Sequence, residues 1–151
     1  MTADRPWKVP ESVLVVIHDH QHRILLLERA DHPGFWQSVT GSLDAPNEPV
    51  VEAARREVWE ETGIDCSTDR FLDWQFTQVF EIFAHWRHRY APGVTHNTEH
   101  VLSLMVPSEQ PVQLSPREHL RYQWLDWRTA AETCFSWTNA EAIRQLMTRQ
   151  T

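Results

Sequence analysis

The sequence predicts a mixed α/β fold, with several strands, a central helix and a terminal helix, in a single domain over residues 1–151. Three observations support this class. Short β-branched and aromatic runs alternate with turn residues, two other segments repeat apolar residues at helical spacing, and the length suits one hydrophobic core. The hydrophobic content of 41% and the charged content of 23% are ordinary for a globular protein.

The first half of the chain contains three apolar runs typical of strands, separated by turn residues. The first two runs are close enough to pair as a hairpin, and the third ends at Gly41. Strands are expected at residues 12–17, 23–27 and 35–40, with a turn at 18–22 and a loop at 31–34.

A helix is predicted after a loop at residues 42–47. Asn47 is a suitable N-cap, and Pro49 is compatible with a first helical turn. The helix is expected to continue through Thr62 and to end at Gly63, since glycine commonly follows the last helical residue.

The second half contains further strand patterns and a closing helix, in which Ala142, Ile143, Leu146 and Met147 recur at helical spacing. The expected elements are a strand or a bent pair of strands at 74–89, a loop at 91–97, strands at 99–106 and 122–125, and a helix at 139–149.

Glu57, Glu60 and Glu61 are predicted to share one face of the central helix. At about 100° per residue, Glu60 and Glu61 lie about 60° and 40° to either side of Glu57. The neighbouring face carries the apolar residues Val51, Ala54 and Val58. The acidic stripe therefore borders the stripe that faces the core.

Three carboxylates on one face repel one another unless a cation compensates. Mg²⁺ prefers oxygen ligands, often binds substrate phosphates, and can polarise a phosphoryl oxygen and lower the pKa of a bound water. The alternative is a solvated acidic face paired with Arg55 and Arg56. The metal site is favoured because the stripe borders the core, and because the preceding strand, glycine and loop would let the Gly41 backbone approach the same cation.

Gly41, Glu48 and the segment 56–64 resemble the Nudix box. That motif is a Gly, five residues, a Glu, seven residues, Arg-Glu, an aliphatic residue, any residue, Glu-Glu, any residue, Gly and an aliphatic residue. The interval from Glu48 to Arg56 keeps the motif's spacing. Six residues separate Gly41 from Glu48, and Asn47 occupies the expected Glu position, which we interpret as a one-residue insertion.

The rest of the chain, from about Trp7 to Leu146, is similar to the bacterial dihydroneopterin triphosphate pyrophosphohydrolases of folate synthesis. The segments that carry this resemblance are 35–42, 80–83, 88–95 and 118–120. The resemblance implies a Nudix α/β/α sandwich around a mixed sheet, with a catalytic loop-helix-loop. It also implies Mg²⁺-dependent hydrolysis of dihydroneopterin triphosphate to dihydroneopterin monophosphate and pyrophosphate.

The resemblance also implies roles for individual residues. Glu57 and Glu61 would be the main ligands for Mg²⁺, or for Mn²⁺ as a substitute, with Glu60 and the Gly41 backbone beside them. Glu118 would join the metal site or act as general base, and Arg56 would orient the carboxylates. The implied substrate contacts are Lys8, Arg29, Thr40, Phe80, Glu81, Ile82, Phe83 and Ser136.

Each substrate contact has a physical rationale. Lys8 and Arg29 can neutralise a triphosphate, Phe80 or Phe83 can stack on a flat bicyclic ring, and Glu81 can accept hydrogen bonds from its N–H groups. Without the resemblance, surface exposure would explain Lys8, and core packing would explain the two aromatic residues.

Two other functions remain open. One is a pyrophosphohydrolase for normal or damaged purine nucleoside triphosphates, since guanine and pterin share a similar hydrogen-bonding edge. The other is a Nudix domain that binds a nucleotide without turnover, against which the intact helix carboxylates argue.

The charge and cysteine content bear on the expected partners and cellular compartment. A formal net charge of −7 disfavours nucleic-acid and anionic-membrane partners. Two widely spaced cysteines, and a polar N-terminus containing Asp4, Arg5 and Lys8 rather than a signal peptide, favour the cytoplasm. The expected partner is a small-molecule triphosphate. The sequence leaves the oligomeric state open, and a monomer is compatible with it.

Nine histidines raise the question of a zinc site, above all at His18, His20 and His22. These residues lie where a hairpin turn is required, and no distant Cys or His completes a ligand set. The sequence therefore favours a turn. His88 and His119 lie in segments covered by the resemblance, where they could contact phosphate or stabilise the site.

Overall fold

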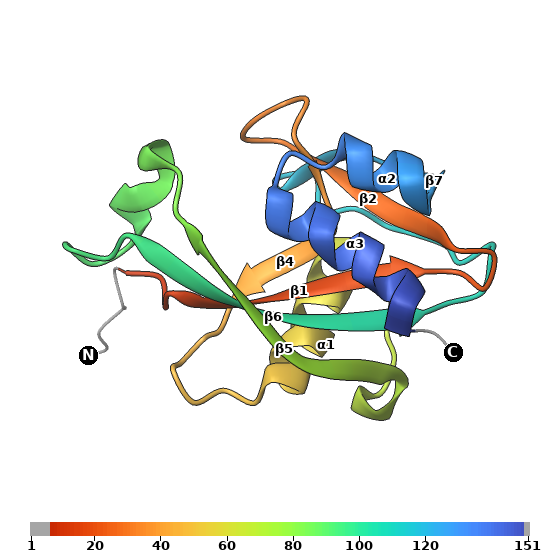
Figure 1. The fold of residues 1–151 in the computed structure, drawn as a ribbon, viewed down its shortest axis with the longest axis horizontal. Helices are drawn as coiled ribbons and strands as arrows, with labels where there is room; N and C mark the ends of the chain where they lie inside the picture. Colours follow the sequence, from red (N-terminus) through yellow and green to blue (C-terminus); the bar gives the residue numbers. More distant parts are fainter. Residues whose placement is uncertain (1–6, 150–151) are drawn as a thin grey trace.

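The computed structural model describes residues 7–149, in which α1 lies on one side of a sheet and α2 and α3 on the other (Figure 1). Residues 1–6 and 150–151 lie outside the described part, and so does most of the N-terminal segment used above to argue against a signal peptide. The arrangement is the α/β/α sandwich that the family resemblance implies.

The helices and strands have the following bounds in the structure. The strands are β1 Glu11–His18, β2 Arg23–Arg29, β3 Trp36–Gln37, β4 Val39–Ser42, β5 Phe71–Glu81, β6 His96–Met105 and β7 His119–Asp126. The helices are α1 Val50–Thr62, α2 Trp127–Thr133 and α3 Trp137–Arg149, with 3-10 helices η1 Thr68–Arg70 and η2 Ala84–Arg89.

Within the described residues, the seven strands form one mixed sheet. Five of them follow the order β3-β2-β1-β6-β5, and the other two pair at the side, β4 with β1 and β7 with β2. β1 and β6 are parallel, and the other paired strands are antiparallel. The expected hairpin forms only where His18 meets Ile24; beyond that point β1 pairs with β4 and β2 pairs with β7. The separation of β1 from β2 opens the sheet on one side.

Alternating side chains of β1 form the two halves of the core. Val13, Val15 and Ile17 pack in a cluster with residues of α1. Leu14 and Val16 pack in a second cluster with residues of α2 and α3. A β-branched run that is buried on both faces is typical of a central strand covered by helices.

The expected strand at 35–40 is two strands in the structure, because the chain changes partner at Ser38. β3 pairs with β2, whereas β4 pairs with β1. The buried Ser38 amide donates a hydrogen bond to Asn139 Oδ1 over 2.8 Å. The C-terminal helix therefore satisfies a backbone group that a continuous strand would have paired in the sheet.

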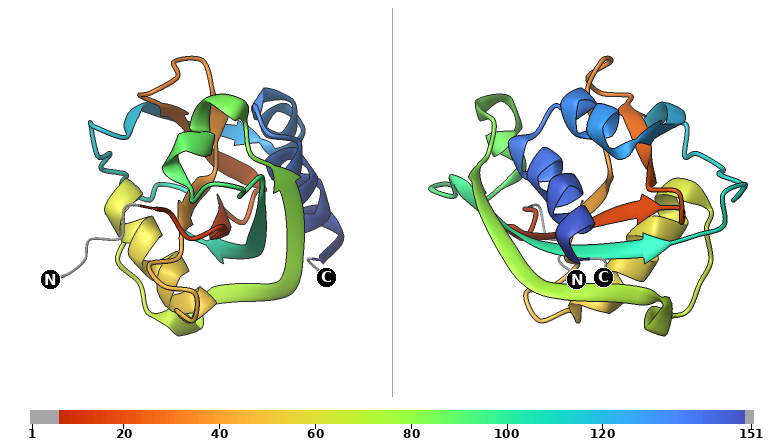
Figure 2. Two further views of the ribbon diagram at one scale, coloured as in Figure 1. Left: turned by 90° about the vertical axis from the view of Figure 1, so that its left-hand side faces the viewer. Right: turned by 45° about the vertical axis from the view of Figure 1, so that its right-hand side comes forward.

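The expected strand at 74–89 is wrong at both ends. β5 begins at Phe71, and its register shifts between Asp73 and Thr77, where Gln75 has a φ of 53°. Figure 2 shows the resulting bend along β5. Residues 84–89 form η2 instead of a strand.

Aromatic packing explains why η2 replaces the strand. Phe83 and Trp86 stack with ring centroids 5.4 Å apart, and both rings meet Phe35 and Phe135 edge to face. The four rings come from three distant segments. Their mutual packing is a long-range contact that local strand propensity does not contain.

Some of the predicted helix ends are correct and others are wrong. The prediction of Asn47 as N-cap is wrong: α1 begins at Val50, with Pro49 as an N-cap that makes no side-chain hydrogen bond. Gly63 is confirmed as the end of α1, with a φ of 73° and its amide donating to the Trp59 carbonyl over 2.9 Å. The expected helix at 139–149 begins two residues earlier, at Trp137.

The short helix α2 was not expected. Asp126 provides its N-cap, because the side chain accepts hydrogen bonds from the amides of Arg128 and Thr129. Within residues 7–149, no helix is long and apolar enough to cross a membrane.

Candidate active site

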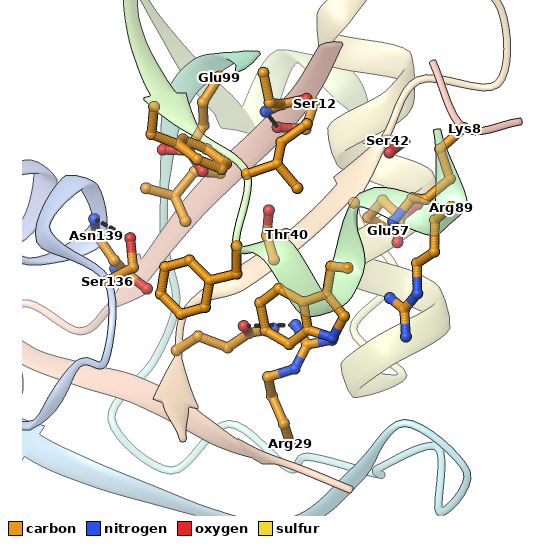
Figure 3. A pocket seen from close by; sticks show the side chains of 18 of the residues that line it. Lys8, Ser12, Arg29, Thr40, Ser42, Glu57, Arg89, Glu99, Ser136 and Asn139 are labelled. Atoms are coloured by element: carbon orange, nitrogen blue, oxygen red, sulfur yellow. Dashed lines mark hydrogen bonds between the residues drawn. The ribbon is translucent and has the colours of Figure 1, made fainter. Parts of the chain in front are cut away.

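A cavity of about 870 Å³ occupies the open side of the sheet, where side chains of β1, β4, β6 and α1 face η2. Figure 3 shows that its ends differ in chemistry. Lys8, Glu57 and Arg89 lie at one end, whereas Glu99 and Ser12 lie at the other. We call these the charged end and the ring end.

Glu57 lies against the backbone of Gly41 at the charged end. Its side chain is buried, and a Cβ atom placed on Gly41 would overlap the Glu57 carboxylate. Burial and repulsion from Glu60 raise the pKa of Glu57, although contacts with Glu61 and Arg56 oppose the rise. The Gly41 requirement predicted from the motif therefore has a steric origin in this structure.

Glu61 is one helical turn from Glu57 and is only 2% exposed. Burial, together with repulsion from Glu57 and Glu118, raises its pKa well above the ordinary value. Its Oε1 atom has no hydrogen-bond partner among the described residues. The buried pair thus has unused acceptor capacity and a cost of ionisation that a cation would remove.

His119 lies beside this pair. Its Nε2 is 3.9 Å from Glu61 Oε1, beyond hydrogen-bonding distance. Burial and the nearby Arg29 lower the pKa of His119 to about 4, so the ring is neutral near pH 7. A neutral imidazole leaves the carboxylates without charge compensation from this side.

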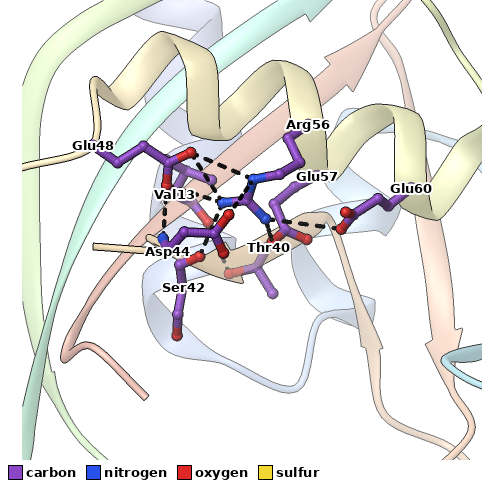
Figure 4. A network of polar contacts seen from close by, with 8 residues as sticks. All are labelled: Val13, Thr40, Ser42, Asp44, Glu48, Arg56, Glu57 and Glu60. Atoms are coloured by element: carbon purple, nitrogen blue, oxygen red, sulfur yellow. Dashed lines mark hydrogen bonds and ion pairs between the residues drawn. The ribbon is translucent and has the colours of Figure 1, made fainter. Parts of the chain in front are cut away.

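Arg56 holds the carboxylates of the loop and helix together (Figure 4). Its guanidinium donates to Glu57 Oε2 over 2.8 Å and to Glu48 Oε1 over 3.0 Å. Glu48 also accepts a hydrogen bond from the Asp44 amide over 2.7 Å. Despite the inserted residue, Glu48 is therefore connected to the site through Arg56 and organises the loop before α1.

Glu60 is separated from the other two helix carboxylates. It is exposed, does not line the cavity, and lies 3.8 Å from Arg56 Nη1. The helical-wheel estimate placed three acids on one face, but the boundary of the core divides that face. Only Glu57 and Glu61 are buried.

The residues at the charged end fit a hard divalent cation. Glu57 and Glu61 supply buried carboxylate oxygens, Gly41 leaves the space beside them free of a side chain, and Glu118 lines the same cavity. In residues 7–149, no three His, Cys, Asp or Glu side chains are already clustered tightly enough to hold a metal ion. The fit therefore rests on the buried pair, with Glu118 as the nearby third carboxylate.

Four cationic residues line the cavity: Lys8, Arg29, Arg89 and Arg117. Desolvation, followed by repulsion from Arg89 and Arg29, lowers the pKa of Lys8. Asp31 accepts from Arg29 over 2.7 Å and from Arg89 over 3.2 Å, and hydrogen bonding to Arg29 is the main cause that lowers its pKa to about 2. An anionic ligand here would meet concentrated positive charge in a protein of net charge −7.

The remaining residues predicted to contact substrate also line the cavity. Phe80, Ile82 and Phe83 contribute apolar surface, and Arg29 lies over the Trp86 ring with 4.3 Å between guanidinium carbon and centroid. Thr40 donates to the Val13 carbonyl over 2.9 Å. Ser136, whose hydroxyl lies 2.9 Å from that of Thr138, also lines the cavity.

Glu81 also lines the cavity, and its predicted contact with substrate stays a prediction. Its carboxylate forms an ion pair with Arg87 and is largely exposed. The acceptors that are buried at the ring end are instead Asn97 and Glu99, at 1% and 5% exposure.

Sequence reasoning did not identify the polar residues of the ring end: Ser12, Asn97, Glu99 and Asn139. One signal was available. Asn97 and Glu99 are two residues apart, so they lie on the same face of a strand that later carries the apolar pair Val101 and Leu102. Ionisable residues at such positions are rarely buried without a functional reason.

The histidine-rich segment forms the expected turn between β1 and β2. Asp19 stabilises it by accepting hydrogen bonds from the Gln21 and Arg23 amides over 2.9 and 3.0 Å. His88 is exposed on η2 and does not line the cavity.

Comparisons with known proteins agree with this arrangement. The chain is 48% identical over 147 residues to the dihydroneopterin triphosphate diphosphatase of Escherichia coli K12, covering 95% of this chain and 96% of that protein. It is 41% identical over 144 residues to the enzyme of the same name from Haemophilus influenzae, covering 93% and 89%. The solved structure of the E. coli dihydroneopterin triphosphate pyrophosphohydrolase superposes with a TM-score of 0.86, covering 93% of this chain and 97% of that chain. Residues 8–146 match the NUDIX domain, and the chain therefore belongs to the Nudix family.

Proposed function

We propose that this protein hydrolyses dihydroneopterin triphosphate to dihydroneopterin monophosphate and pyrophosphate, using Mg²⁺ or, as a substitute, Mn²⁺. Similarity along nearly the whole chain to two enzymes named for this substrate supports the proposal. The observation that carries it is the two-ended cavity. One continuous space joins a buried carboxylate pair and four cationic residues to aromatic walls and unpaired acceptors.

The residues divide the reaction between them. Glu57 and Glu61, with Glu118 and the Gly41 backbone, would hold the cation, while Glu60 would act from outside the cavity through Arg56. When bound, the cation supplies charge neutralisation for the phosphates and a lowered pKa for a coordinated water. Arg56 orients Glu57, and Lys8 and Arg29 bind phosphate oxygens.

Hydrolysis then proceeds by displacement at phosphorus. The oxygen of water forms a new bond to a phosphorus atom of the α–β bridge, and a carboxylate of the Glu57, Glu61 and Glu118 group takes the proton from that water. The bridging P–O bond breaks, and its electron pair leaves with the phosphate that is not attacked. That group is pyrophosphate if water attacks the α phosphorus, and dihydroneopterin monophosphate if it attacks the β phosphorus. The aromatic wall holds the ring and excludes bulk water from the cavity.

The direct test is an assay of the purified protein with Mg²⁺, measuring pyrophosphate released from dihydroneopterin triphosphate, GTP and dATP in parallel. We expect the highest kcat/KM on dihydroneopterin triphosphate. A clear preference for dATP or for an oxidised purine nucleotide would reject this substrate.

Glu57→Gln tests the carboxylate pair. Because the substitution removes a charged ligand and keeps the side-chain volume, we expect kcat to fall by about 100-fold or more with the fold retained. Glu52→Gln on the exposed first turn of α1 is the matched control and should keep full activity. Unchanged kcat in folded Glu57→Gln protein would contradict the metal assignment.

A second candidate is a guanine nucleoside triphosphate, or a damaged one. The specific observation in its favour is the pair of buried acceptors at the ring end, since guanine and pterin present the same amino and N–H donors. The parallel assay ranks the two substrates. A Nudix domain without turnover would show activity on neither.

The cysteines and the net charge also bear on the compartment and the partners of the protein. We propose a single domain over residues 1–151 that works in the cytoplasm as a monomer on a small-molecule triphosphate. Free Cys66 and Cys134 suit a reducing compartment. The net charge of −7 disfavours nucleic acid and anionic membranes as partners.

A further inference from the structure

Two buried acceptor atoms at the ring end have no hydrogen-bond partner within residues 7–149. Glu99 Oε1 and Asn97 Oδ1 are inaccessible atoms without a hydrogen bond among the described residues. Both residues line the cavity. Buried acceptors are normally satisfied, so two unsatisfied ones on the same wall indicate donors that arrive with a ligand.

The surroundings hold these two side chains in place. Asn97 donates its amide hydrogen to Ser12 Oγ over 2.8 Å, and Glu99 accepts a hydrogen bond from Thr138. Ser12 and Glu99 are opposite each other in the parallel pairing of β1 with β6. Asn97 is therefore fixed through its amide nitrogen and Glu99 through its contact with Thr138. Asn97 Oδ1 and Glu99 Oε1 are left to accept hydrogen bonds from a ligand.

No cationic side chain of the described residues forms an ion pair with Glu99. It takes part in none of the ion pairs found in residues 7–149, and the neighbouring Gln78 donates to the Thr138 carbonyl instead. Burial raises the pKa of Glu99 to about 7, as expected for a carboxyl group without a positive neighbour. The position is costly for the fold and is explained if it recognises a ligand.

We propose that Glu99, with Asn97 beside it, selects the 2-amino-4-oxo-pyrimidine edge that pterin and guanine share. The carboxylate accepts two parallel hydrogen bonds, from the ring N–H and from the exocyclic amino group. Adenine presents an acceptor nitrogen where this edge has the N–H, so its lone pair would face the carboxylate. This inference rests on the proposed function and adds the residue that distinguishes between rings.

The position of Glu99 separates this role from the hydrolytic chemistry. Glu99 and Glu57 lie at opposite ends of the cavity (Figure 3). Phe80 and Phe83 line the same cavity and supply apolar surface for a flat ring. Substitution of Glu99 should therefore change which ring is accepted without changing how the phosphates are hydrolysed.

The kinetic test compares the wild type with Glu99→Gln on dihydroneopterin triphosphate, GTP and ATP. We expect kcat/KM to fall about 10- to 100-fold on the first two substrates, mainly through KM, and to stay unchanged on ATP. Glu99→Asp, which keeps the charge on a shorter side chain, should give a smaller loss. Glu109→Gln removes the same charge from an exposed position outside the cavity and should match the wild type on all three.

A binding measurement keeps this test independent of turnover. Neopterin and guanosine lack the triphosphate, so their affinities in EDTA report ring recognition alone, with adenosine as the unmatched ring. We expect the wild type to bind neopterin and guanosine at least 10-fold more tightly than Glu99→Gln does, with equal, weak binding of adenosine. If no triphosphate is hydrolysed but this difference holds, the proposed function fails and the role of Glu99 stands. Equal losses on all rings, or no loss, would overturn the role.

Discussion

At the scale of single residues, the site depends on how closely the backbone of Gly41 approaches the Glu57 carboxylate. That approach leaves no room for a Cβ atom, and Arg56 holds Glu57 from the other side over 2.8 Å. The backbone at Gly41 is not in the left-handed region, unlike that at Gly34, Gly63 and Gly93. Gly41 is therefore required for space rather than for conformation.

Gly41→Ala should consequently damage activity more than stability. The added methyl group displaces the end of a flexible side chain, so the fold can adapt, but the carboxylate moves from its place. Because a misplacement of about 1 Å can cost about 100-fold in rate, we expect a loss of that order in kcat. Thermal unfolding in EDTA should shift by only a few degrees. A variant with wild-type kcat would show that Glu57 does not need this position.

Individual site residues were predictable to different degrees. The spacing of Glu57 and Glu61 on a helix beside the core is visible in the sequence, and both are buried in the cavity wall. Glu60 satisfies the same helical spacing and is exposed, since helical periodicity does not locate the edge of the core. Glu99 escaped notice because its burial depends on the pairing of β6 with β1 and β5, which are remote in the chain.

At the scale of elements, α1 must end abruptly so that the chain can turn back along the sheet. Gly63 provides this end with a φ of 73°. The Gln113 amide, from the distant segment between β6 and β7, donates to the Thr62 carbonyl over 2.8 Å. A Cβ on Gly63 would approach Gln113 Cβ to 3.2 Å. Both the conformation and the packing therefore favour glycine here.

We expect Gly63→Ala to lower the free energy of unfolding by about 1–2 kcal/mol, because a left-handed conformation costs about that much for an L-residue with a Cβ. Gly63→Asn is the matched comparison and should lose less, since asparagine tolerates this conformation. Urea unfolding of the three proteins measures the difference. Equal losses in the two variants would mean that the crowding at Gln113, not the backbone, sets the penalty.

Elements whose signals are local were predicted, and those that depend on distant partners were not. The apolar runs of β1 and β2 and the helical spacing in α1 and α3 are local patterns, and each element occurs where expected to within a few residues. The break at Ser38 depends on Asn139, and η2 depends on rings from other segments. For α2, the capping Asp126 was a local signal that the strand expected at 122–125 obscured.

At the scale of the whole molecule, the cavity places ionisable groups where water is scarce, so the stability of the fold is linked to pH. The folded state keeps the Glu99 proton up to a pKa of about 7, against 4.5 for an unperturbed side chain. Between these values the folded state binds more protons than the unfolded state, so stability falls as pH rises. The loss is complete above pH 7.

Glu99→Gln removes this linkage. The unfolding free energy of the variant relative to the wild type should rise by about 3 kcal/mol from acidic pH to above neutral pH. Urea titrations in EDTA at several pH values between 4.5 and 8 measure the rise, and the contributions of Glu57 and Glu61 cancel because both proteins contain them. Parallel profiles for the two proteins would show that Glu99 ionises in the fold as freely as in water.

The placement of the two ends of the cavity on different elements, β6 and α1, affects how the enzyme can evolve. The acceptors at Asn97 and Glu99 occupy alternate positions of one strand, whereas Glu57 and Glu61 belong to α1. Exchanging two side chains of β6 can thus give a descendant a different ring preference while its helix is inherited intact. In this architecture, substrate specificity can therefore evolve separately from the hydrolytic reaction.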